Sequence, residues 1–85
     1  MNYDEGELIG LFMRVDELVD GARKDLQIHN DRTSAKKKLF EAGHKLIAPS
    51  RDLKLSLETR KTVTDALEAI TVQLRALIAI EANLN

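Results

Sequence analysis

The side chains whose types and spacing could do chemistry are few, and the first pair is Glu41 and His44. Their Glu-x-x-His spacing places a carboxylate and an imidazole on one face of a helix, as in di-iron helical bundles. Such bundles need two of these motifs and two more glutamates, and the sequence contains one motif. We therefore assign Glu41 and His44 to a solvated helix face, and a small metal-binding or enzymatic bundle is the weakest of three functional hypotheses.

The remaining candidates for catalysis are equally sparse. His29 precedes Asn30 and Asp31 in a polar stretch typical of a helix end, and no serine or aspartate is spaced to suggest a triad with either histidine. The chain contains no cysteine, which excludes disulfides, thiolate metal ligands and a cysteine nucleophile. The sequence therefore predicts a protein that is not an enzyme and that uses no metal or cofactor.

The most basic stretch lies between residues 32 and 38. The backbone N–H groups at the start of a helix favour phosphate, so this stretch is a candidate phosphate site. Its members are Arg32, Lys36, Lys37 and Lys38. Against this interpretation, the helix dipole disfavours cations there and no aromatic residue stands beside them for base stacking. Binding of nucleic acid or of a phosphate-bearing nucleotide is therefore an alternative, less favoured than a solvated basic face.

The overall charge does not favour a nucleic-acid partner either. Thirteen basic and fourteen acidic residues leave a net charge of −1, which gives no general attraction to nucleic acid or to an anionic membrane. The longest apolar run is much shorter than the roughly 20 residues of a membrane span. The start of the chain, residues 1–7, is acidic where a signal peptide is basic, so we expect a cytoplasmic protein with no membrane partner.

The hydrophobic pattern predicts a single all-α domain, residues 1–85. Apolar residues recur at steps of three and four after Asp4, a plausible N-cap, and predict a first helix over residues 4–28. A second helix is predicted over residues 33–48, capped by Asp31 or Thr33 and ended by Pro49. Its predicted inner stripe consists of Ala35, Leu39, Ala42 and Leu46, and Phe40 and Ile47 widen this stripe.

The third helix has the most regular pattern in the chain, and its start is ambiguous. Its apolar residues follow each other at steps of four, three, four and three, which is the heptad period of a helix-packing seam, and they are Val63, Leu67, Ile70, Leu74 and Leu77. We favour a helix over residues 56–83, with Ser56 as N-cap after a short irregular linker. A single helix from Ser50 to Asn83, about 50 Å long, is the alternative.

These elements predict a three-helix antiparallel bundle with a long C-terminal helix that the other two cannot fully cover. The end of that helix is apolar nearly all round, so we expect it to dimerise. The predicted protein interface consists of Leu74, Leu77, Ile78, Ile80 and Leu84. The favoured function is accordingly a non-catalytic interaction module, a small adaptor, regulator or inhibitor that binds another protein and itself through helix faces.

Overall fold

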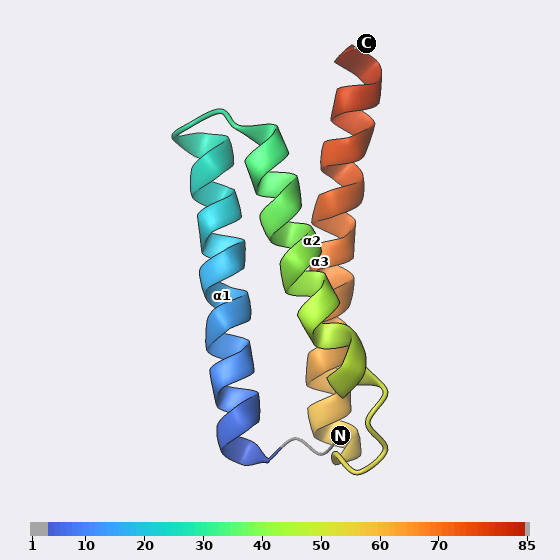
Figure 1. Ribbon diagram of the computed structural model, residues 1–85. Helices are drawn as coiled ribbons and strands as arrows, with labels where there is room; N and C mark the ends of the chain where they lie inside the picture. The colour runs from blue at the N-terminus through green and yellow to red at the C-terminus, as the bar shows by residue number, and fades with distance from the viewer. Residues whose placement is uncertain (1–3, 85) are drawn as a thin grey trace.

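The computed structural model describes residues 4–84, and the structure of residues 1–3 and Asn85, which include the start of the acidic N-terminal stretch, lies outside this range. The described residues form three helices and no strand: α1 (Glu5–Gln27), α2 (Arg32–Ser50) and α3 (Leu57–Leu84). The chain runs up along α1, down along α2 and up again along α3 (Figure 1). The predicted all-α, up-down-up architecture with a long C-terminal helix is thus confirmed.

Short-range hydrogen bonds explain where α1 and α2 begin. The Asp4 carboxylate accepts a hydrogen bond from the Glu7 N–H at 2.7 Å and caps α1, as predicted. In the turn after α1, Asn30 adopts a left-handed φ of 50°, which asparagine tolerates better than most residues. The Asp31 carboxylate then accepts from the Ser34 N–H at 3.0 Å, so Asp31 and not Thr33 caps α2.

The prediction that Pro49 ends the second helix was wrong by two residues, because α2 continues through Pro49 to Ser50. Proline has no N–H to bond the carbonyl one turn back and its ring crowds that carbonyl, but only Ser50 follows it in α2, so little of the helix is disturbed. The Ser50 hydroxyl donates to the Ile47 carbonyl at 2.5 Å, which satisfies one of the orphan carbonyls of that last turn. The Pro49 ring is fully buried, so it also adds to the core.

The linker before α3 is irregular, as expected, and the single long helix from Ser50 is excluded. The Asp52 side chain accepts from the Lys54 N–H at 3.0 Å in a local turn. The Ser56 hydroxyl accepts from the Thr59 N–H at 3.1 Å and so caps α3. The predicted helix start at Ser56 is therefore confirmed to within one residue.

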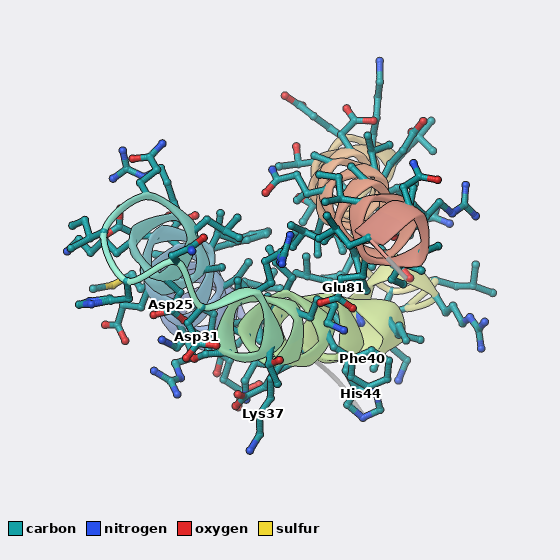
Figure 2. The ribbon with its side chains drawn as sticks, turned by 90° about the horizontal axis from the view of Figure 1, so that it is seen from above. Asp25, Asp31, Lys37, Phe40, His44 and Glu81 are labelled. Atoms are coloured by element: carbon teal, nitrogen blue, oxygen red, sulfur yellow. The ribbon has the colours of Figure 1, made fainter. Side chains whose placement is uncertain are left out.

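The helices do not close into a compact triangle. α1 and α3 each pack along α2 but hardly touch one another, so α2 lies at the vertex of an open V when the molecule is seen from above (Figure 2). The predicted seam of α3 faces α2, with Val63, Ile70 and Leu77 buried. Because only one neighbour covers α3, both flanks of this helix remain open to solvent.

Candidate functional site

The predicted interface residues in the C-terminal half of α3 fall into two groups that differ in solvent exposure. Leu77 is only 7% exposed and Leu74 is half-buried, and both pack against the chain's own core. Ile78, Ile80 and Leu84 are 53%, 48% and 63% exposed. The accessible part of the predicted interface is therefore the second group, which forms the exposed apolar end of α3.

The exposed apolar residues of this end lie on two sides of the helix. Ile78 comes one turn after Leu74 and shares its side, which borders a groove between α2 and α3. Ile80 comes two turns after Gln73, which lines a second groove between α1 and α3 together with Val19 and Leu26. Ile78 and Ile80 stand about 160° apart on the helix, so a single added helix could not cover both, and a partner that buries them together must contact α3 with more than one element.

The structure places two of the four candidate phosphate residues in ion pairs within the chain. The Lys36 ammonium lies 2.5 Å from the Glu81 carboxylate and ties the start of α2 to the end of α3. The Lys38 ammonium donates to the Asp25 carboxylate at 2.7 Å and ties α2 to α1. Both lysines therefore have structural partners that a phosphate would have to displace.

Asp25 is the one buried charged residue of the described chain, and its 7% exposure makes the bond to Lys38 important. The Lys38 ammonium, and after it the Ser34 side chain, holds the pKa of Asp25 below its ordinary value of 3.8. Gly21 leaves room for this contact, since a Cβ there would lie 3.3 Å from Cδ of Lys38. The pair thus orients α1 against α2 beside the turn that connects them.

The other two candidates, Arg32 and Lys37, make no ion pair among the described residues. The N-terminus of α2, beside Arg32, is already capped by the Asp31 carboxylate. This carboxylate accepts from the Ser34 N–H, one of the free N–H groups that an anion would use. Phosphate binding by these four residues stays a prediction, and this arrangement adds nothing in its favour.

Glu41 and His44 lie exposed on α2. The nearest charged partner of Glu41 is Arg14 of α1, with 4.0 Å between the Arg14 Nη2 and Glu41 Oε1 atoms. Within residues 4–84 no group of three histidine, cysteine or acidic side chains could hold a metal ion. His29 is exposed in the turn between α1 and α2, far along the chain from His44.

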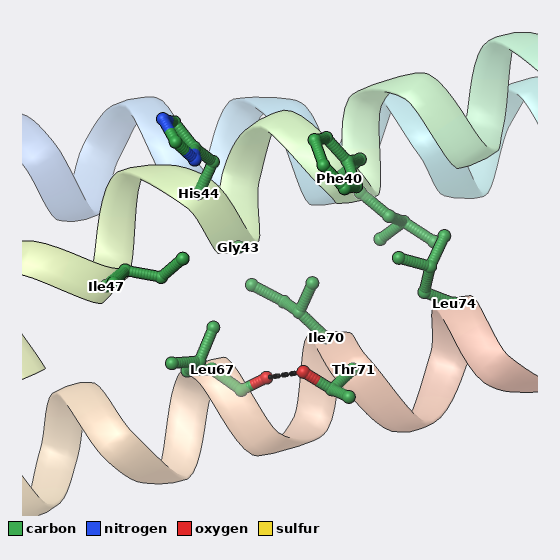
Figure 3. A pocket seen from close by; sticks show the side chains of 9 residues that line it. Phe40, Gly43, His44, Ile47, Leu67, Ile70, Thr71 and Leu74 are labelled. Atoms are coloured by element: carbon green, nitrogen blue, oxygen red, sulfur yellow. Dashed lines mark hydrogen bonds between the residues drawn. The ribbon is translucent and has the colours of Figure 1, made fainter.

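A concave surface with a volume of about 170 Å³ lies between α2 and α3, and we call it the α2–α3 groove. Figure 3 shows its two walls, formed by Leu39, Phe40, Gly43, His44 and Ile47 of α2 and by Leu67, Ile70, Thr71 and Leu74 of α3. The Thr71 hydroxyl donates to the Leu67 carbonyl at 2.8 Å, so it has a partner within its own helix. The groove therefore presents an almost entirely apolar surface.

Two residues of this groove contradict the sequence prediction. Phe40 and Ile47 were expected to widen the inner stripe of α2, but they are 67% and 38% exposed. The reason is that α1 and α3 both pack against α2 and leave the side that carries Phe40 open (Figure 2). A signal was present in the sequence: Phe40 and Ile47 are seven residues apart, a helix-packing spacing separate from that of Leu39 and Leu46.

Gly43 forms the floor of the α2–α3 groove, and its replacement by alanine should stabilise the protein. A Cβ at this position would lie 3.6 Å from both Ile70 Cγ2 and Leu67 Cδ1, which is ordinary van der Waals contact. Alanine also favours a helix over glycine by about 1 kcal/mol. We expect Gly43→Ala to raise the free energy of unfolding by roughly 1 kcal/mol, measured by urea denaturation.

The control for this change is Gly10→Ala, at a position where an added Cβ meets nothing within 4 Å. This variant gains helix propensity alone, so the difference between the two variants reports the packing at Gly43. A destabilised Gly43→Ala variant would show that the groove floor cannot accept even one methyl group.

Comparisons of the chain with models of protein families, with curated proteins and with solved structures found no match. None of the helices over residues 4–84 combines the length and the apolar character that crossing a membrane requires. The function must therefore be argued from the surface of the molecule itself.

Proposed function

We propose that this protein is a non-catalytic helical interaction module, a small adaptor, regulator or inhibitor that acts in the cytoplasm. It self-associates through the exposed apolar end of α3, in a dimer, and offers its remaining helix surface to another protein. The proposal rests on binding surfaces and requires no reactive group.

One observation supports this proposal most directly: α3 is covered by α2 alone, although its apolar residues extend well beyond one stripe. A helix that lies on a single neighbour needs only one apolar stripe, and apolar residues outside that stripe indicate a further contact. Ile78, Ile80 and Leu84 are such residues. Glu81, the charged residue nearest to them, is already neutralised by Lys36, so little charge opposes their burial.

The free energy gained by burying the exposed apolar end of α3 is of the same order as the entropy cost of association. Complete burial of an isoleucine or leucine side chain contributes about 1.5–3 kcal/mol relative to exposure. About half of that surface remains to be buried at each of the three residues, and a two-fold axis doubles the total. This gain can exceed the lost translational and rotational freedom that opposes association only if several residues contribute together.

The test changes Ile78 and Ile80 together to lysine. We expect the wild type to sediment as a homo-oligomer at micromolar concentration, and the double variant to sediment at the 9.5 kDa of a single chain. Because both side chains are already about half exposed, the variant should keep the helix signal of the wild type in circular dichroism. A wild type that sediments as a single chain would disprove self-association.

A matched control is available on the outer face of α1. Ile9 and Met13 are 57% and 60% exposed, so changing both to lysine adds the same charges at sites of similar exposure. The control variant should remain oligomeric. If it dissociates as well, added charge and not the apolar end of α3 would be responsible.

A further inference from the structure

A second surface, on α2, has the spacing of a helix-packing seam but faces solvent. Its residues follow each other at steps of three, four, three and four, and the last of them directly follows α2; we call them the α2 stripe: Lys37, Phe40, His44, Ile47 and Arg51. All five are exposed. Lys37, Phe40 and His44 point to the same side of the molecule in Figure 2. This spacing is typical of residues that meet a neighbouring helix, and within residues 4–84 no helix lies over them.

The shape of the surface beside the α2 stripe suits a helix as well. Phe40 and Ile47 form two projections one on either side of Gly43, where the missing side chain leaves the floor of the α2–α3 groove open (Figure 3). The volume of about 170 Å³ is enough for a large apolar side chain inserted between them. Projections that alternate with a hole are what knobs-into-holes packing requires.

The charges along this surface favour an acidic occupant. Lys37 and Arg51 stand at the two ends of the α2 stripe and have no ion-pair partner among residues 4–84. The nearest acidic residue of α2, Glu41, is directed toward Arg14 of α1. On α3, Glu68 and Arg75 stand about one turn before and after Thr71 and cancel each other. The unbalanced charge beside the groove is therefore positive.

From this combination we infer that the α2–α3 groove binds an acidic amphipathic helix of another protein. The α2 stripe spans about 21 Å, the length of roughly four helical turns. The bound helix places apolar side chains against Phe40, Gly43 and Ile47 and carboxylates near Lys37 and Arg51. Single-stranded nucleic acid is less well matched, because its bases stack on successive aromatic side chains and the stripe offers only the rings of Phe40 and His44.

This inference rests on the proposed interaction function; the groove borders the side of α3 that carries Ile78, and not the side that carries Ile80. The probe is a fluorescein-labelled synthetic helix of three heptads, with leucine at the a and d positions, glutamate at e and g, and alanine elsewhere. Its affinity is measured by fluorescence anisotropy at low ionic strength. A second peptide with lysine in place of every glutamate tests the sign of the charge. We expect the acidic peptide to bind at least tenfold more tightly than the basic one.

Variants of the groove locate the contact. Phe40→Ala with Ile47→Ala should weaken binding of the acidic peptide about tenfold, because both anchors are exposed and their removal leaves the core intact. Ile9→Ala with Met13→Ala removes comparably exposed side chains from α1 and should leave the affinity unchanged. Lys37→Glu with Arg51→Glu should weaken binding and remove its salt dependence, whereas Lys54→Glu with Lys61→Glu should not.

Several results would overturn the inference. They are the absence of peptide binding, equal affinity for the acidic and basic peptides, or a loss of affinity in the Ile9→Ala, Met13→Ala control as large as that in the Phe40→Ala, Ile47→Ala variant. Tighter binding of a labelled oligothymidylate than of the acidic peptide would assign the surface to nucleic acid instead. Sedimentation of the same variants reports self-association separately: a monomeric wild type that still binds the acidic peptide would disprove only the dimer.

Discussion

Replacing Leu39 by alanine should lower the free energy of unfolding by about 2–5 kcal/mol, the largest loss expected from a single change in this protein. Leu39 is 1% exposed and lies at the centre of α2, where it borders both the α2–α3 groove and the groove between α1 and α3. Its removal would connect the two grooves through the middle of the molecule. Because α1 and α3 hardly touch each other, no other contact could compensate.

A small domain has only a modest free energy of unfolding, so this variant should be largely unfolded or close to its transition at room temperature. Urea denaturation followed by circular dichroism measures the loss. The same leucine-to-alanine change at Leu53, which is 82% exposed in the linker, should alter stability by less than about 0.5 kcal/mol. Equal losses in the two variants would show that α2 is not the centre of the core.

Replacing Asp25 by asparagine should destabilise the protein at neutral pH, by an amount that disappears in acid. The Asp25 carboxylate is nearly buried and accepts a hydrogen bond from the Lys38 ammonium, and this contact lowers the pKa of Asp25. A lowered pKa means that ionised Asp25 favours the folded state. Its contribution is complete above the ordinary value of 3.8 and is lost as the pH falls through the lowered pKa of the folded protein.

The measurement is the free energy of unfolding of wild type and Asp25→Asn between pH 7 and pH 2. The difference should be greatest at neutral pH, where the variant leaves the Lys38 ammonium without its charged partner, and should shrink below pH 3.8 as the wild-type carboxyl becomes neutral. Asp16→Asn, on the exposed face of α1, should show little difference at any pH. A constant difference across the range would mean that asparagine disturbs packing and that the charge of Asp25 is unimportant.

The open arrangement also explains how one small chain can have more than one binding surface. In a closed three-helix bundle each helix would cover part of both neighbours, and the flanks of α2 and α3 would be buried. Here α2 alone joins the other two helices, so the groove beside Phe40 and the apolar end of α3 both remain accessible. Gly43 keeps the α2–α3 groove deep, because an alanine at this position would fit the core but make the groove shallower.

The amino-acid sequence by itself determined where the helices begin and which face of α3 forms the seam. The caps Asp4, Asp31 and Ser56 each bond an N–H three residues ahead, so their effect depends on neighbours in the chain and can be read without the fold. The heptad spacing of α3 likewise identified Val63 and Ile70 as buried, because periodicity alone selects one face of a helix.

Only the tertiary structure decided which residues at the margins of the apolar helix faces are buried. Phe40 has the spacing of a residue at the margin of a core, and it is exposed because α1 and α3 meet α2 elsewhere. The pairing of Lys36 with Glu81 joins residues 45 positions apart, and no local pattern indicates it. A hydrophobic period fixes the direction in which a helix must be buried, but the breadth of burial depends on how far its neighbours wrap around it, and that depends on contacts between distant parts of the chain.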